Sequence, residues 1–373
     1  MKITRVDETP QEIIHFDDDG PKLEPQHIED IAEIFQTPLT GAYNWDYTIA
    51  DTRIKKLYEL GKELNWNANT DIEWNRPFPR DEFPAKQDTN ELNGYQPYDD
   101  MSPEKKLEMA WHLHSWTQSQ FLHGEQGALL VASQLVSCAP TYTAKLYAAS
   151  QTFDEARHVE VYNRYLQEQV RFMWPISPYL KALLDKILTD ERWDLKFIGM
   201  QIIIEGLALA AFNTAKITTR DPLLYDIVSY VIRDEARHVT FGVNYLEEYV
   251  STLSDEERDD RGMFAYEACV IMRERLMPTE VWSHFGLDAE DTRRYILEGG
   301  QLSEFRQLLF SRVIPNLKRI GLLTDKVIPH FDQLGLLDYE EMPDDSEIDW
   351  AEMTKPLEEK PSAEMDAESV PAH

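Results

Sequence analysis

The residues best suited to chemistry lie in a duplicated segment of the chain. Asp154-Glu155-Ala156-Arg157-His158-Val159 recurs letter for letter at 234–239, an offset of 80 residues. A further glutamate precedes the Glu of each copy by 30 residues, Glu125 in the first case and Glu205 in the second. Because residues three positions apart project from one face of a helix, each copy presents a Glu and a His together.

A single Glu-x-x-His pair on a helix is usually a surface pair or a satisfied polar pair. Duplication in register with an upstream Glu favours a metal site, because four carboxylates and two imidazoles inside a four-helix bundle are the ligand set of paired iron or manganese ions. Two divalent cations would cancel the charge of four buried glutamates, which is costly in a low-dielectric core. Oxygen donors with one imidazole per metal favour iron or manganese. The predicted ligands are Glu125, Glu155, His158, Glu205, Glu235 and His238.

Two aspartates and two arginines within the copies are predicted to support these ligands. Asp154 and Asp234 precede the ligand glutamates and lie one turn before the histidines, so their carboxylates can orient an imidazole. Arg157 and Arg237 follow three residues later and can pair with these aspartates. The alternative is that the four residues form ordinary ion pairs on the helix surface.

Helix signals place the predicted ligands on four long central helices. Ser102 before Pro103 marks one helix start and Asp221 before Pro222 marks another, because Ser and Asp cap helices and Pro is favoured in the first turn. The long helices are expected at 103–139, 141–172, 193–219 and 222–253, with others at 177–189, 254–277, 288–299 and 304–321. Strand-like alternation is scarce, so the predicted fold class is all-α.

Composition divides the chain into four parts. Residues 1–100 hold eight prolines and one helically periodic stretch at 51–64, which predicts an irregular N-terminal arm. Residues 101–280 are expected to form the metal-binding bundle, and residues 281–338 a helical extension. Residues 339–373 are predicted to be a disordered acidic tail, because 340–373 contain 12 Asp or Glu against two Lys.

Charge and cysteine content exclude several functional classes. A formal net charge of −31 argues against nucleic acid and anionic membrane surfaces as partners. The chain has two isolated cysteines and no flavin, nicotinamide or iron–sulfur motif, so electrons would have to come from a separate reductase or ferredoxin. Neither a signal peptide nor a run of 18 apolar residues is visible, so a cytoplasmic location without membrane insertion is expected.

The two repeated segments, together with Glu125 and Glu205, resemble the ferritin-like di-iron carboxylate superfamily over about residues 105–250. Gly124-Glu125 followed by Ala128 is most similar to the hydroxylase subunits of bacterial multicomponent monooxygenases. The resemblance implies a ferritin-like four-helix bundle with extra flanking helices and two iron ions, with manganese or a mixed pair as alternatives. It also implies that Glu155 and Glu235 bridge the metals, that O2 and a small organic substrate react there, and that a homodimer is possible.

Three positions depart from the enzymes that the chain resembles. Leu209 stands where monooxygenase hydroxylases carry a threonine, and Val231 stands where arylamine N-oxygenases carry an additional histidine. Ala132 occupies the position of the radical-storing tyrosine of ribonucleotide reductase small subunits. These departures leave hydroxylation, desaturation and N-oxidation open as reaction types.

Side chains that flank the ligands by helical phase are mostly apolar, which suits a hydrophobic or aromatic-sized substrate. Tyr162, one turn after His158, and Gln201, one turn before Glu205, are the polar candidates for a catalytic role. Packing within the bundle core is the alternative for both residues.

These observations predict an O2-activating di-iron oxygenase or oxidase that acts on a small apolar or aromatic substrate. One alternative is iron oxidation or peroxide scavenging, as in ferritins and rubrerythrins, although their bundles are usually much shorter. Another is an accessory subunit of a larger oxygenase, although such subunits generally lose ligands and this chain retains all six. Steady turnover of an organic substrate separates the first hypothesis from the second.

Overall fold

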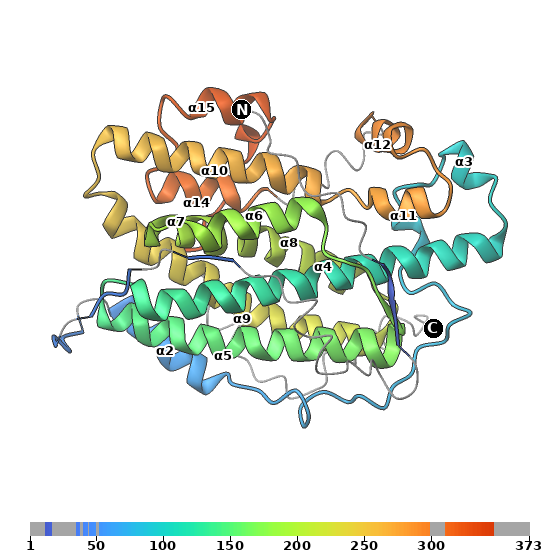
Figure 1. The fold of residues 1–373 in the computed structure, drawn as a ribbon, viewed down its shortest axis with the longest axis horizontal. Coiled ribbons are helices and arrows are strands. Elements are labelled where there is room, and N and C mark those ends of the chain that lie inside the picture. Colours follow the sequence, from blue (N-terminus) through green and yellow to red (C-terminus); the bar gives the residue numbers. More distant parts are fainter. Residues whose placement is uncertain are drawn as a thin grey trace, which may run out of the picture.

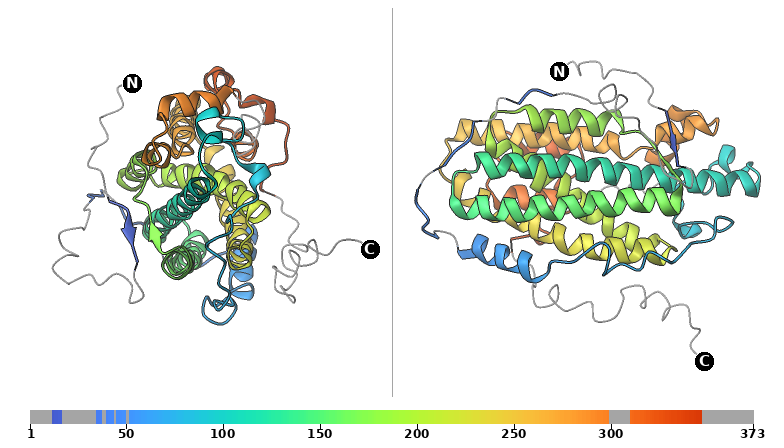
Figure 2. Two further views of the ribbon diagram at one scale, coloured as in Figure 1. Left: turned by 90° about the vertical axis from the view of Figure 1, so that its right-hand side faces the viewer. Right: turned by 60° about the horizontal axis from the view of Figure 1, so that its bottom comes forward.

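Four helices form the centre of the protein. The computed structural model describes residues 12–16, 35–37, 40–43, 45–49, 52–298 and 310–346. Within it, α4 lies along α5 and α8 lies along α9, and α5 also contacts α9 (Figure 1). The two further views in Figure 2 show these helices side by side in one bundle. The central helices are α4 (Pro103–Cys138), α5 (Tyr142–Tyr165), α8 (Glu205–Thr218) and α9 (Pro222–Val250).

Side-chain caps fix where three of these helices begin. The hydroxyl of Ser102 accepts a hydrogen bond from the backbone of the first turn of α4, and Thr141 does the same for α5. The carboxylate of Asp221 caps α9, in which Pro222 occupies the first turn. Each cap satisfies a backbone N–H that has no partner inside its helix. The helix starts predicted from Ser102 and Asp221 are confirmed.

The third central helix reaches Glu205 through a wider turn. The stretch expected as one helix at 193–219 comprises α7 (Trp193–Phe197), the π-helical segment η3 (Ile198–Ile204) and α8. The backbone N–H of Glu205 accordingly donates to the carbonyl of Met200, five residues back. Trp193–Thr218 is long and apolar enough to cross a membrane, but 83% of its most apolar window is buried inside the protein. It is therefore a core helix.

Flanking helices cover the bundle on two sides. Helix α2 packs against α5 and α9, whereas α6 and α10 pack against each other beside η3 (Figure 1). A two-residue antiparallel pair joins β1 (Ile14–His15) to β2 (Phe172–Met173). The flanking elements are α2 (Thr52–Glu63), η1 (Gln87–Thr89), α3 (Gln96–Asp99), η2 (Leu166–Val170), α6 (Pro178–Thr189), α10 (Asp255–Arg275), α11 (Thr279–His284), α12 (Ala289–Glu298), α14 (Val313–Arg319), α15 (Ile328–Gln333) and η4 (Leu337–Tyr339).

The all-α, ferritin-like fold class expected from the sequence is confirmed. The described part of residues 1–100 includes α2 but is otherwise mostly irregular, in line with the predicted arm. Most of the predicted acidic tail, residues 347–373, lies outside the described residues, as do 299–309 within the predicted extension. The division into four parts remains a prediction.

A close backbone contact ties the C-terminal helices to α10. A Cβ atom added to Gly262 would lie 2.6 Å from the carbonyl oxygen of Leu322 and 2.8 Å from a methyl group of Val327. We therefore expect Gly262→Ala to lower the free energy of unfolding by about 1–3 kcal/mol, measured by urea denaturation. Gly206→Ala is the matched control, because its Cβ would meet no described atom closer than 4.0 Å. The control should raise helix stability by about 1 kcal/mol, and equal effects of the two changes would contradict this packing.

Candidate metal centre

Six buried side chains meet between the four central helices, as the repeat predicts. They form two groups that share Glu155, and the donor atoms within each group lie within 4.8 Å of one another. One group is Glu125, Glu155, His158 and Glu235, and the other is Glu155, Glu205 and His238. The most exposed of the six, Glu125, is only 5% exposed.

Glu155 and Glu235 each lie close to both histidines. The Nδ1 atom of His158 lies 3.4 Å from Glu155 and 3.2 Å from Glu235. The Nδ1 atom of His238 lies 3.1 Å from Glu155 and 3.7 Å from Glu235. Glu125 is 3.4 Å from the same atom of His158. The two glutamates of the repeat therefore occupy the central position that a bridging ligand requires.

The supporting aspartates contact the histidines in a crossed arrangement. The Nε2 atom of His158 lies 3.2 Å from Oδ2 of Asp234, and that of His238 lies 3.3 Å from Oδ2 of Asp154. The sequence placed each aspartate one turn before the histidine of its own segment, yet each contacts the histidine of the other segment. With Nδ1 turned towards the glutamates, Nε2 points across the interface between α5 and α9. A proton held on Nε2 leaves the Nδ1 lone pair for a metal.

Both arginines of the repeat contact both aspartates. Arg157 donates to Asp154, and also to Asp234 at 3.1 Å. Arg237 donates to Asp234 at 2.5 Å and to Asp154 at 3.0 Å. Arg157 is 4% exposed and Arg237 is fully buried, so the alternative of a surface ion pair is wrong. Because each residue has partners from both helices, the four charges form one buried network between α5 and α9.

The arm supplies a contact that the repeat does not reveal. Trp66 is buried, and its indole Nε1 donates to Oδ2 of Asp234 at 2.8 Å. The guanidinium of Arg157 lies over the Trp66 ring at 5.0 Å and donates to the side chain of Asn65. The sequence signal for this contact is the pair Asn65-Trp66, which directly follows the helically periodic stretch 51–64. Without knowledge of where the arm lies, that signal could not be connected to Asp234.

Burial shifts the pKa values of the glutamate carboxyl groups. Burial and the neighbouring Glu235 raise the pKa of Glu125 to about 8. The pKa of Glu205 is raised well above its usual range for the same two reasons, and that of Glu235 is also raised. Burial acts against ionisation of Glu155 as well, but His238 and His158 hold its pKa below the usual value. The raised pKa values of Glu125, Glu205 and Glu235 reflect like charges crowded in a low-dielectric space, which a cation between them would relieve.

The donor atoms left without partners test whether metal ions fit this space. Among the described residues, one carboxylate oxygen each of Glu155, Glu205 and Glu235 is buried without a hydrogen-bond partner. The same holds for Nδ1 of His158 and of His238. Buried polar atoms are normally satisfied, and all five of these belong to residues of the two donor groups. Oxygen and imidazole donors of this kind fit iron or manganese.

Gln201 reaches the centre through a second glutamine. Its amide donates to the side-chain oxygen of Gln151 at 3.3 Å. Gln151 in turn donates to Glu205 at 2.7 Å and to Glu155 at 3.2 Å. Gln151 is therefore the residue that contacts two predicted ligands directly, and Gln201 fixes the orientation of the Gln151 amide.

Tyr162 lies among aromatic rings beside the predicted ligands. Its ring stacks on Phe212 with 5.9 Å between centroids and lies 5.7 Å from Phe121. Within the described part of the chain its hydroxyl is buried without a hydrogen-bond partner. Burial and the charge of Glu125 raise the pKa of Tyr162 well above its usual range. The phenol is therefore a neutral O–H next to the centre.

The three departures noted in the sequence are apolar in the structure as well. Val231 and Ala132 are fully buried, and Leu209 is 5% exposed. None of the three can bind a metal or donate a proton, so this chain has six predicted ligands and no seventh at position 231.

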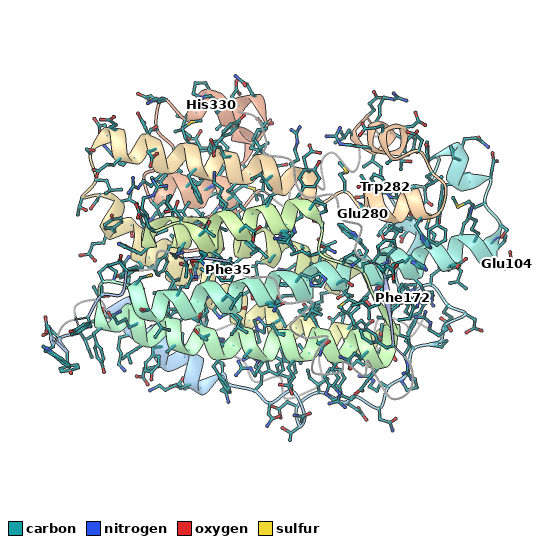
Figure 3. All side chains as sticks on the ribbon, in the orientation of Figure 1. Phe35, Glu104, Phe172, Glu280, Trp282 and His330 are labelled. Atoms are coloured by element: carbon teal, nitrogen blue, oxygen red, sulfur yellow. The ribbon has the colours of Figure 1, made fainter. Side chains whose placement is uncertain are left out.

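A cavity of about 340 Å³ lies beside α4, and none of the six predicted ligands is among its lining residues. Its walls include Phe121 of α4, Ala211 of α8 and Arg275 of α10. Trp282 of α11 also lines it, at the end of the molecule where Figure 3 labels this residue. Phe121 lies one turn before Glu125, so this wall residue is on the helix face that carries a predicted ligand.

The contact between Asp234 and His158 predicts that the buried network supports metal retention. We expect Asp234→Asn to weaken metal affinity by about 10–100-fold, because His158 loses the carboxylate that orients it. Asp194→Asn is the matched control, since Asp194 is also buried and pairs with Arg261 at 2.8 Å, but is no part of this network. Competition with a chelator measures both affinities, and equal metal retention in the two variants would contradict the role of Asp234.

Comparison with known proteins identifies the family. The family model of P-aminobenzoate N-oxygenase AurF matches residues 50–321. No curated protein matches the chain. Solved structures with a related fold include a variant of an R2-like ligand-binding oxidase with a Mn/Fe cofactor (18% identity, 73% of this chain and 94% of the other, TM-score 0.43). Another is the dimanganese(II) NrdF of Streptococcus sanguinis (15% identity, 78% of this chain and 99% of the other, TM-score 0.47).

The family model covers the whole bundle and most of the flanking helices. It confirms the superfamily that the duplicated motif predicts, and it names an N-oxygenase family where the sequence pattern was most similar to monooxygenase hydroxylase subunits. The predicted enzyme class and two-metal cofactor are confirmed, because this family consists of di-metal carboxylate oxidoreductases and the Glu/His cluster is present. The chain therefore belongs to the AurF family of P-aminobenzoate N-oxygenases, within the ferritin-like di-metal carboxylate superfamily.

Proposed function

We propose that this protein is an oxygenase that uses O2 at a pair of iron ions to oxidise a small aromatic or apolar substrate. The observation that carries the proposal is a set of buried donor atoms without hydrogen-bond partners. A cavity of substrate size lies one helical turn along α4 from Glu125, at Phe121. Manganese or a mixed pair would fit the same donors. The proposed ligands are Glu125, Glu155, His158, Glu205, Glu235 and His238, with Glu155 and Glu235 as bridges.

Residues around the ligands orient the histidine rings and the glutamate carboxylates through hydrogen bonds. Asp234 and Asp154 hold the Nε2 protons of the histidines, which keeps Nδ1 free. Gln151 donates to Glu205 and so fixes one carboxylate oxygen while leaving the other available. The bound metals would supply O2 activation and electron transfer. The surrounding apolar side chains exclude water from the reacting groups.

The proposed substrate class follows from the cavity and the family. The family name contains p-aminobenzoate, which makes this compound the first substrate to test. Phe121 and Trp282 provide aromatic walls for a ring of that size. Because Val231 stands where arylamine N-oxygenases carry an additional histidine, this chain has one side-chain ligand fewer than those enzymes. The reaction test should therefore detect N-oxidation, ring hydroxylation and desaturation alike.

The proposed partners follow from what the chain must obtain elsewhere. Reduction of two metals needs an external donor, which we propose to be a reductase or ferredoxin docking on the acidic surface. We further propose a cytoplasmic enzyme that forms a homodimer and binds neither nucleic acid nor membrane. The strongly negative charge of the chain supports the last two points.

Product formation tests this proposal. Iron-loaded protein with a chemical reductant, O2 and p-aminobenzoate, or a panel of small aromatic amines and acids, should yield oxidised products. N-oxidation and hydroxylation products should carry ¹⁸O from labelled O2, whereas a desaturation product should lose two hydrogens and carry no label. His238→Ala should abolish product formation, because one metal loses its imidazole. Rapid oxidation of ferrous iron without any organic product across the panel would contradict the proposal and favour the ferritin-like alternative.

Tyr162 is proposed to take part in catalysis as a neutral hydrogen-bond donor. We expect Tyr162→Phe to lower product formation by about 100-fold, a typical effect of removing one positioned hydrogen-bond donor. The same change should leave the metal content intact and raise the free energy of unfolding by about 1 kcal/mol, because an unpartnered buried hydroxyl is removed. Turnover equal to that of the unchanged protein would assign Tyr162 to core packing.

A further inference from the structure

Arg275, the last residue of α10, is a buried cation without a carboxylate partner. It is 8% exposed, and its hydrogen bond goes to the sulfur of Met272 at 3.5 Å. No carboxylate among the described residues lies within ion-pairing distance of its guanidinium. Burial lowers its pKa to about 10, so the side chain is still charged at neutral pH. A buried guanidinium that lacks an anion is costly and needs an explanation.

The metal centre does not supply the missing negative charge. With two divalent ions bound, the four glutamates and two aspartates would be balanced by those ions together with Arg157 and Arg237. Glu125 lies near enough to influence the pKa of Arg275, but its carboxylate belongs to the predicted ligand set. Arg275 would then be one positive charge beyond that balance.

The guanidinium lies where a ligand could reach it. Arg275 lines the cavity together with apolar side chains that include Phe121, Leu276 and Trp282. A Cβ atom added to Gly124 would lie 3.6 Å from Nη2 of Arg275. Gly124 immediately precedes Glu125, and Glu125 is close enough to affect the pKa of Arg275, so the charge lies on the side of the cavity wall nearest this predicted ligand. One buried charge in a largely apolar space is the usual composition of a site that orients a small ligand.

We propose that Arg275 binds the carboxylate of the substrate, and that the cavity takes the apolar body of the same molecule. Guanidinium and carboxylate match as a two-point hydrogen-bonding pair, which gives orientation as well as affinity. The inference rests on the proposed function and assigns a residue to the recognition of the acid group. It also makes Arg275 the residue that distinguishes an acid from a neutral compound of the same shape.

Ligand binding without turnover tests this assignment. Calorimetry on the iron-loaded protein in the absence of O2 compares benzoate with benzamide, its neutral counterpart. We expect benzoate to bind at least tenfold more tightly than benzamide, and the preference to disappear in Arg275→Leu. Lys86→Met is the matched control, because Lys86 is a second cation on the cavity wall but is exposed to solvent, and it should keep the preference.

A stability measurement separates a binding role from a structural one. Removal of an unpaired buried charge should leave the Tm of Arg275→Leu equal to or above that of the unchanged protein. Arg275→Gln, which keeps a polar end without the charge, provides the same binding comparison if the Leu variant does not fold. Equal affinity for benzoate and benzamide, no binding of either, or a preference that survives in both Arg275 variants would overturn the proposal. Since O2 is absent, these results do not depend on whether the protein turns over a substrate.

Discussion

The burial of four glutamates between four helices is the constraint on which the rest of the structure depends. Carboxylates in a low-dielectric core repel one another and resist ionisation, as the raised pKa values of Glu125, Glu205 and Glu235 show. A bundle with such a centre is stable only if cations or protons neutralise it. The unpartnered oxygen and nitrogen atoms at the centre are arranged for cations.

A second, outer layer of charge holds this centre in place. Asp154, Asp234, Arg157 and Arg237 contact one another across α5 and α9, and each aspartate also contacts the histidine of the opposite segment. The duplicated sequence therefore produces a network with approximate two-fold symmetry. Trp66 breaks that symmetry by binding one aspartate, which makes the N-terminal arm part of the site and not only its cover.

How much the sequence could predict depended on whether the relevant contacts were local. The exact repeat predicted the convergence of Glu155, His158, Glu235 and His238, because helical spacing alone puts each pair on one face. The crossed aspartate contacts depend on how α5 and α9 meet, and the π-helical turn before Glu205 depends on packing around η3. Arg275 lies far from the repeat in sequence and comes close to Gly124 only because of the fold.

The metal content of the purified protein tests the central claim most directly. Anaerobic loading with ferrous iron, followed by removal of loosely bound metal and elemental analysis, should give close to two irons per chain. Glu155→Ala should bind markedly less, because the side chain shared by both donor groups is lost. Fewer than one metal per chain that loading does not increase, or full loading in Glu155→Ala, would contradict the account.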